Sequence, residues 1–405
     1  MNETRPEDPS SAGSLTVYFA LERFLGLFCG EGAQWNYGGA EMQMYYLARS
    51  FAALPATRVV LLTTQAGYTS IYPGITIQQI KKPPHTGNII VRMRQKHVPA
   101  PLVWAAEKLI KRANRVRRRK LFEDRSEQSV LLLSSFEKLE IVEAAHIKGL
   151  KLVYRISGDS LVDGSYAPET FTRTYIDHLL DLSDAVVVQS EHQQHTFAKN
   201  YGRDSTVIAS SFAWEDLPSA PAARKKQVLW IGRCVAIKRP WLVLELAHRL
   251  PQAHFVLIAP PAPDDELYQE IEREAQDLEN VTLIPGLARN EILQCYLESS
   301  VVINTSFSEG MPNTLIEACA TETPYVSYRL DINGLLGEGG IGDCAHEDFE
   351  SFVDLVSQYL DSDEKRAEAG RKASEYARNT WSIQTATEAY IKLFEELQPV
   401  ERTRS

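Results

Sequence analysis

The stretch "VVINTSFSEGMPNTLIEACATETPYVSY", residues 301–328, decides the fold. Its two apolar ends have the pattern of short buried strands, and the segment between them has the pattern of a turn followed by a helix. We expect the helix to begin near Pro312, because proline is favoured at the first helical position. Glu309 then lies in the loop, and Glu317 lies about a turn and a half inside the helix. Both can border one ligand, or they are ordinary charges favoured near a helix N-terminus.

The rest of the chain repeats this strand–helix alternation. The segments "QVLWIG", "HFVLIAP" and "VTLIPG" have the pattern of strands and alternate with segments of helical length. The N-terminal half shows the same theme with "LTVYFAL", "TRVVLLTT", "SVLLLSS", "LKLVYRIS" and "DAVVVQS". Such alternation predicts parallel βαβ units. The predicted fold class is therefore α/β, with two Rossmann-like, doubly wound domains that face a central cleft.

The domain boundaries are predicted from a change in composition. A chain of 405 residues exceeds what one hydrophobic core usually organises. The segment "AWEDLPSAPAARKKQ" is rich in proline, alanine and charge, and it lacks periodicity. The last segment has a helical apolar stripe behind Ser382, a suitable N-cap. The predicted organisation is a disordered tail (1–13), a first domain (14–212), a linker (213–226), a second domain (227–380) and a closing helix (381–398).

Composition limits the class of protein and its compartment. A formal net charge of -10 argues against a nucleic-acid partner. The five cysteines are widely spread and show no C-x-x-C spacing, which fits a reducing cytoplasm. The N-terminal residues carry no apolar signal segment, and no long apolar run follows. We therefore expect a cytoplasmic protein that does not span a membrane.

Two further loops after strands carry residues suited to phosphate, since ligands of doubly wound sheets bind at the carboxyl ends of strands. Gly38 and Gly39 precede an amphipathic helix, whose N-terminal N–H groups favour an anion, although a glycine pair is often only a turn. Gly232 ends a strand and is followed by Arg233 and Lys238. Two cations on one loop suit a diphosphate, or they are a solvated turn.

Four of these motifs, taken in order, resemble those of a known family. "GGAE", "IGR" with Lys238, "NVTLIPG" and the two glutamates separated by seven residues have the order and approximate spacing seen in retaining glycosyltransferases of the GT-B fold, family four. The resemblance implies a hexosyltransferase-type enzyme of polysaccharide or glycolipid biosynthesis. The donor would be a UDP-, GDP- or ADP-linked sugar, and the acceptor a glycan, a lipid-linked or a small molecule. It also implies no metal or other cofactor, an acceptor-binding first domain, and a closing helix that crosses back to it.

The resemblance also implies roles for individual residues. Arg233 and Lys238 would hold the diphosphate, and Glu309 would contact the donor sugar; these three are the predicted catalytic residues. Glu317 would bind the ribose hydroxyls. The predicted donor-binding residues are Gly38, Gly39, Gly232, Gly286, Leu287, Ala288, Gly310, Met311, Pro312, Asn313, Thr314 and Glu317.

One loop departs from the family pattern. Many members carry a histidine after the strand that corresponds to "LKLVYRIS", whereas here Ser157 occupies that place. Arg155, Ser157 and Asp159 are therefore candidate contacts of the acceptor or the sugar. Asp159 is also a candidate acceptor-side base, although an aspartate after Gly158 is commonly a turn residue.

A basic segment and two competing functions remain. Residues 107–120 carry eight lysines or arginines on an apolar helical stripe, which predicts a solvated face or a peripheral contact with an anionic membrane. A noncatalytic nucleotide-sugar-binding protein would keep the phosphate loops. An NAD-dependent dehydrogenase would share the fold, but "GLFCGEG" does not fit the spacing of a dinucleotide-binding motif.

Overall fold

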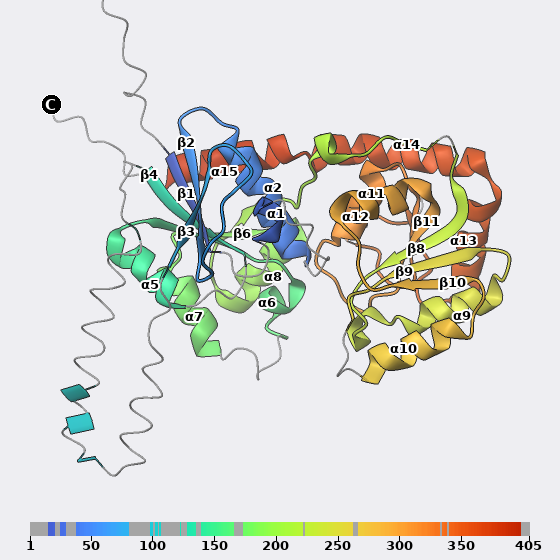
Figure 1. The fold of residues 1–405 in the computed structure, drawn as a ribbon, viewed down its shortest axis with the longest axis horizontal. Helices are drawn as coiled ribbons and strands as arrows, with labels where there is room; N and C mark the ends of the chain where they lie inside the picture. The colour runs from blue at the N-terminus through green and yellow to red at the C-terminus, as the bar shows by residue number, and fades with distance from the viewer. Residues whose placement is uncertain are drawn as a thin grey trace, which may run out of the picture.

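The computed structural model shows two parallel-sheet α/β domains (Figure 1). The predicted tail 1–13 and the basic segment 107–120 lie outside the residues that it describes. The described residues are 15–20, 25–29, 38–80, 98–99, 102–103, 105–106, 122, 128–134, 139–165, 173–221, 223–261, 266–332, 334–337 and 340–397.

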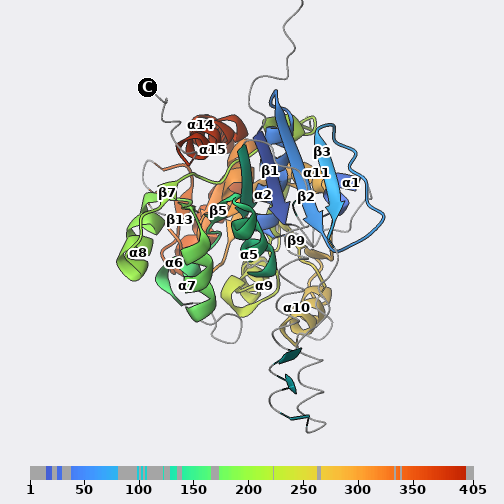
Figure 2. The same ribbon diagram turned by 90° about the vertical axis from the view of Figure 1, so that its left-hand side faces the viewer.

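The first domain is built on a sheet in the order β3-β2-β1-β4-β5-β6-β7, in which every described pair is parallel. Figure 2, in which this domain faces the viewer, shows β3 and β7 on opposite sides. The central strand β1 is buried along its whole length, as expected for a parallel sheet covered on both faces. The strands are β1 (Leu15–Ala20), β2 (Thr57–Thr63), β3 (Ile75–Gln79), β4 (Gln128–Leu133), β5 (Lys151–Arg155), β6 (Ala185–Val188) and β7 (Thr206–Val207). The described helices are α1 (Gly26–Cys29), α2 (Gly39–Ala52), α5 (Leu139–Lys148), α6 (Asp159–Asp163), α7 (Arg173–Leu182) and α8 (Glu191–Tyr201).

The second domain has a parallel sheet in the order β10-β9-β8-β11-β12-β13. In both sheets the strand order reverses beside the first strand, between β1 and β4 and between β8 and β11, where doubly wound sheets open a crevice for ligands. The strands are β8 (Lys225–Ile231), β9 (His254–Ile258), β10 (Val281–Ile284), β11 (Ser299–Asn304), β12 (Tyr325–Ser327) and β13 (Asp343–Cys344). The described helices are α9 (Trp241–Arg249), α10 (Glu266–Gln276), α11 (Arg289–Glu298), α12 (Asn313–Ala320), α13 (Phe349–Asp361) and α14 (Asp363–Thr380). The predicted fold class is confirmed.

The chain passes between the domains twice at one place. The N–H of Phe212 donates to the carbonyl of Trp381 (2.8 Å), and the N–H of Ile383 donates to the carbonyl of Phe212 (3.1 Å). After this crossing, α15 (Ile383–Glu396) packs on α2 of the first domain, where Thr387 Oγ1 donates to Ser50 Oγ (2.7 Å). Figure 1 shows α14 over the second domain and α15 over the first. Strand β8 begins inside the predicted linker 213–226.

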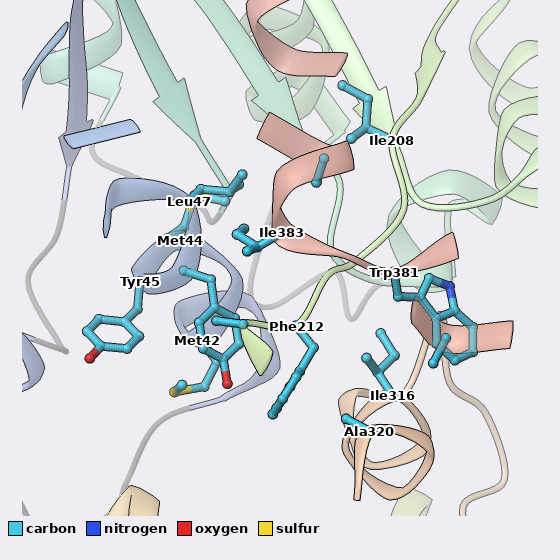
Figure 3. Packing of buried hydrophobic residues seen from close by; sticks show 14 of the residues in the cluster. Met42, Met44, Tyr45, Leu47, Ile208, Phe212, Ile316, Ala320, Trp381 and Ile383 are labelled. Carbon is cyan, nitrogen blue, oxygen red and sulfur yellow. The ribbon is translucent and has the colours of Figure 1, made fainter. Parts of the chain in front are cut away.

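An apolar cluster at this crossing joins the two domains. Met42 of α2, Ile316 of α12 and Ile383 of α15 all belong to it, together with Phe212 and Trp381 from the crossing itself. Figure 3 shows these side chains converging from the different elements. Phe212 is 0% exposed and Trp381 is 1% exposed. Burial of side chains this large stabilises the contact strongly, so the two walls of the cleft are anchored to one shared core.

Candidate functional site

A cleft of about 520 Å³ lies between the domains at the carboxyl ends of both sheets. It brings together most of the predicted residues: Gly38, Gly39, Arg155, Ser157, Gly232, Arg233, Lys238, Glu309, Gly310, Met311, Pro312, Asn313, Thr314 and Glu317. Four predicted residues do not line it: Asp159, Gly286, Leu287 and Ala288. The remaining lining residues, which were not predicted, are Ala40, Glu41, Met42, Gln43, Gln189, Ser210, Ile231 and Pro260.

Two helix N-termini meet across this cleft. Helix α2 begins at Gly39 and helix α12 at Asn313, one residue after Pro312. A Cβ atom on Gly39 would lie 2.3 Å from Nδ2 of Asn313, so only glycine allows this close approach without a shift. Gln43 Nε2 also donates to Asn313 Oδ1 (3.0 Å). The first N–H groups of a helix lack partners within the helix, so the pair of helix ends suits an anion.

The loops after β8 and β11 carry the two predicted cations and Glu309. A short 3-10 helix, residues 236–238, presents Lys238, whose Nζ pairs with Glu309 Oε1. The same carboxylate oxygen accepts a hydrogen bond from Ser306 Oγ (2.7 Å). Arg233 is exposed and lines the cleft, and no carboxylate pairs with it among the described residues. A cation without an anionic partner at a helix-lined cleft is suited to a phosphate.

These two loops are fastened together by an arginine that was not predicted. Arg239 has a left-handed backbone (φ 48°), and its Nε donates to the carbonyl of Thr305 (2.7 Å). Its Nη2 donates to the carbonyl of Ser306 (3.2 Å), the residue that holds Glu309. The position of Glu309 is therefore fixed by contacts within the second domain alone.

The second glutamate has a different environment. Glu317 lines the cleft but is only 7% exposed, and its Oε1 lies 2.8 Å from Nη1 of Arg289. Arg289 Nη2 donates to the hydroxyl of Tyr46 in the first domain (2.5 Å). Burial acts to lower the pKa of Arg289, but Glu317 and Tyr46 outweigh it and keep that pKa above its ordinary value. The predicted ribose-binding residue is thus part of a buried contact between domains.

A buried chain of polar groups forms the first-domain wall. Arg155 is 1% exposed, and its Nη2 donates to Ser210 Oγ (2.7 Å), which donates to Gln189 Oε1 (2.7 Å). The N–H of Gln189 donates to Gln193 Oε1 (2.8 Å). Burial lowers the pKa of Arg155, and no carboxylate pairs with it among the described residues. The wall therefore holds one buried guanidinium at the cleft.

Asp159 lies beside this wall, at the start of α6. Gln193 Nε2 donates to its Oδ1 (2.8 Å), and burial raises the pKa of the Asp159 carboxyl. A Cβ atom on Gly310 of the second domain would lie 3.4 Å from the same oxygen. Asp159 therefore faces the loop that carries Glu309, although it does not line the cleft. Its predicted contact with the acceptor or sugar stays a prediction.

Gly286, Leu287 and Ala288 connect β10 to α11. The N–H of Ala288 donates to Glu291 Oε2 (2.7 Å), which closes the first turn of α11. The predicted contact of this segment with the nucleotide base stays a prediction. Arg289, the next residue, is the first residue of α11, and 13% of its side chain is exposed.

Sequence reasoning missed the polar residues that act across the domains. Gln43 is a buried amide in a helix face that is otherwise apolar, a pattern that could have drawn attention to it. It binds the carbonyl of Ser211 (2.9 Å) as well as Asn313. Arg289 stands in no motif that predicts its ion pair. The Gln43 contact depends on how α2 meets α12, and the Arg289 ion pair depends on how α11 packs on α12. The local sequence contains neither arrangement.

Among the residues that the structure describes, no group of three or more histidine, cysteine, aspartate or glutamate side chains is placed to hold a metal ion. No helix there is both long enough and apolar enough to cross a bilayer.

One family model matches part of the chain. Residues 214–376, which include β8, β11 and both glutamates, match the family described as "Glycosyl transferases group 1". The match covers less than half of the chain. The family region therefore contains the cations, the α12 N-terminus and Arg289, whereas Gly39, Tyr46 and Arg155 come from the other domain.

Relatives of known name are distant. A D-inositol 3-phosphate glycosyltransferase of Corynebacterium efficiens is 25% identical over 287 residues, which cover 64% of this chain and 66% of that protein. The protein of the same name from Mycolicibacterium smegmatis is 24% identical over 230 residues, 50% of this chain and 51% of that protein. The matched stretches thus span less than two thirds of these relatives.

Solved structures show the fold over nearly the whole chain. The Anabaena protein HepE, in complex with UDP and glucose, superposes with a TM-score of 0.66 at 16% identity and covers 94% of this chain and 99% of that one. Sucrose-phosphate synthase of Thermosynechococcus elongatus gives a TM-score of 0.67 at 14% identity, with 95% and 99% covered. The chain therefore shares the two-domain GT-B fold of these structures.

Proposed function

We propose that this protein is a glycosyltransferase that moves a sugar from a nucleotide-sugar donor to an acceptor, with retention of anomeric configuration and without a metal. The observation that carries the proposal is the cleft itself. Two helix N-termini, Arg233 and Lys238 supply positive potential, while Glu309 and Glu317 border the same space. Positive groups for a diphosphate beside carboxylates for hydroxyls are the recognition chemistry of a nucleotide sugar.

The donor would lie in this cleft, with its phosphates at the positive groups and its hydroxyls at the carboxylates. Arg233, Lys238 and the N-terminus of α2 would bind the diphosphate, and Glu317 would bind the ribose hydroxyls. Lys238 now pairs with Glu309, so the incoming phosphate would share its ammonium group. Glu309 would face the donor sugar. The base stays open among UDP, GDP and ADP; binding of UDP by the structural neighbour HepE makes UDP the first to test.

The proposed reaction depends on the charges that develop on the phosphate and the sugar as the bond between them breaks. As the bond between the anomeric carbon and the β-phosphate oxygen breaks, negative charge grows on the phosphate and positive charge on the sugar ring. Fixed cations and helix ends stabilise the departing phosphate, which is commonly the largest contribution to catalysis. The acceptor oxygen bonds to the anomeric carbon on the same face, and its proton passes to the leaving phosphate. Glu309, held by Ser306 and Lys238, would stabilise the cationic sugar and would not attack it.

The acceptor would approach from the first domain. Arg155, Ser157 and Asp159 are the proposed acceptor or sugar contacts on that side. A glycan, a lipid-linked or a small acceptor is compatible with this polar wall. A cytoplasmic protein that touches an anionic membrane through residues 107–120 is part of the proposal, and it rests on their charge and apolar stripe alone.

Thermal unfolding with UDP, GDP, ADP and NAD in turn, without added metal and with EDTA present, tests the donor class. A ligand at about 100 times its Kd should add about 2.7 kcal/mol to native stability and raise the unfolding midpoint. A rise with one nucleoside diphosphate supports the proposal and chooses the donor series. A rise with NAD alone would replace it with the dehydrogenase alternative.

Turnover separates an enzyme from a noncatalytic nucleotide-sugar-binding protein. The chosen nucleotide sugar, incubated with candidate acceptors, should release nucleoside diphosphate, and the anomeric proton coupling of the product should match that of the donor. Inversion of the anomeric signal would contradict the front-face reaction. Binding without release with any acceptor would favour the noncatalytic alternative.

A further inference from the structure

Arg289 forms an ion pair with Glu317, which lines the cleft. We infer that Arg289 is a positioning residue that fixes the carboxylate of Glu317 and, through Tyr46, ties the nucleoside end of the cleft to the first domain. The inference rests on the proposed function, because it assigns Glu317 to the ribose. Arg289 does not itself line the cleft, so its effect on the selection of a ribose would act through Glu317.

The first argument is the burial of Glu317. A carboxylate that is 7% exposed is costly to ionise unless a charge and hydrogen bonds compensate it. Arg289 supplies that charge at 2.8 Å from Oε1. The ion pair leaves Glu317 at the wall of the cleft and fixes the direction of its carboxylate. A fixed acceptor is what selection for two ribose hydroxyls requires.

The second argument is the geometry of the guanidinium. Nη1 contacts Glu317 of α12, while Nη2 contacts the Tyr46 hydroxyl of α2. The remaining nitrogen, Nε, is buried without a hydrogen-bond partner among the described residues, so these two arms set the orientation of the group. A planar fork can satisfy two partners in different directions at once, which the single ammonium of lysine does poorly.

The third argument is the register of the two helices. Gln43 and Tyr46 lie one turn apart on α2, and Asn313 and Glu317 lie one turn apart on α12. Gln43 contacts Asn313 directly (3.0 Å), whereas Arg289 bridges Tyr46 and Glu317. The same two helices present their N-termini to the diphosphate region. Arg289 therefore sets the carboxylate for the ribose on the helix pair that would bind the phosphates.

The test compares each nucleoside diphosphate with its dideoxy counterpart, in which both ribose hydroxyls are hydrogens. Calorimetry on the full chain gives Kd values for UDP, GDP or ADP, whichever the wild type binds, and for the dideoxy form. In Arg289→Met the preference for the ribose form should fall by about tenfold, the scale of a hydrogen bond to a charged group. The dideoxy form should bind both proteins about equally, because it lacks the hydroxyls that Glu317 would accept.

Further variants separate positioning from folding. Arg289→Lys keeps the charge and should lose part of the preference, which covers the case in which Arg289→Met does not fold. Tyr46→Phe removes only the second arm and should keep the preference within about twofold, since the ion pair remains. Arg371→Met, at an exposed position of α14, is the matched control and should change neither Kd.

The outcomes are distinguishable. Equal weakening of the ribose and dideoxy forms in both Arg289 variants would overturn the inference and leave Arg289 a structural residue. If the wild type itself does not prefer the ribose form, the assignment of Glu317 to the ribose fails, and the inference fails with it. Loss of the preference in the Arg289 variants with unchanged dideoxy binding supports both.

Discussion

Glu309 and Glu317 lie only eight positions apart in the sequence, yet they are held in different ways. Lys238 and Ser306, both of the second domain, hold Glu309 at the loop. Arg289 holds Glu317, and that arginine reaches Tyr46 in the first domain. Glu309 is thus held by contacts within one domain, whereas the position of Glu317 depends on an arginine that also contacts the other domain.

The largest expected effect is on transfer, and it belongs to Glu309. Glu309→Gln keeps the shape of the side chain and removes the charge that would face the donor sugar in the proposed reaction, so kcat should fall by about 100-fold or more. Nucleotide affinity, measured by calorimetry with the free nucleoside diphosphate, should change little. An equal loss of nucleotide affinity in the Glu309 and Glu317 variants would remove the difference between the two residues.

The two cations come next. The double variant Arg233→Ala with Lys238→Ala should weaken a nucleoside diphosphate by about 100-fold, because two charge-assisted contacts are lost. The nucleoside without phosphate should bind almost as before. Arg273→Ala on the exposed face of α10 serves as a control. Equal weakening of nucleoside and nucleotide would take both cations out of the phosphate site.

Glu317→Ala should act on stability as well as on binding. It leaves Arg289 buried without its partner, and breaking a buried ion pair from one side costs about 3 kcal/mol or more. Urea unfolding should therefore show a clear loss of unfolding free energy, whereas Glu309→Gln should show little. The exposed Glu375→Ala is the matched control. Unfolding free energies that are the same for the Glu309 and Glu317 variants would contradict the contrast in their surroundings.

Asp159 offers the smallest effect, because it is a carboxylate without a cation partner among the described residues. Burial raises its pKa, so the folded protein holds this proton more tightly than the unfolded chain does. As pH rises through the raised pKa, the wild type loses stability relative to Asp159→Asn. The variant should be more stable at neutral pH by less than about 1 kcal/mol, with the gap narrowing toward pH 3.8, the ordinary value.

Unfolding by urea at several pH values between 4 and 8 checks this. Asp159→Asn can still accept the hydrogen bond from Gln193, so a difference that follows pH reports the charge. A constant difference across that range would mean that the carboxyl is not perturbed by burial.

Much of the fold could be predicted from local sequence, because buried parallel strands are continuous apolar runs. The strands β1, β8 and β11 each contain such a run. Strand β3, "ITIQQ", was missed because it lies at the sheet edge with half of its side chains polar. The predicted N-cap Ser382 accepts from the N–H of Thr385 (3.1 Å), since capping is decided within one turn.

The site residues show the same difference between what local sequence predicts and what depends on packing. Glu309, Glu317 and Lys238 could be placed because their spacing along the chain fixes them relative to a strand end or a helix start. The ion pair of Glu317 with Arg289, 28 positions earlier, could not be placed, since it depends on how α11 and α12 pack. The approach of Gly39 to Asn313 likewise requires the two domains to be brought together.

The paired crossing at Phe212 and Ser382 has a consequence for how this molecule can be rebuilt. The chain leaves the first domain and returns to it at adjacent backbone positions. In topological terms the second domain is an insertion whose two ends meet. Because its two ends are adjacent, the second domain can be removed and the first domain closed by a short turn. It can also be replaced by another domain whose ends are equally close, and the order of strands in the first-domain sheet stays the same. The two walls of the cleft thus belong to units that can be exchanged separately in one chain.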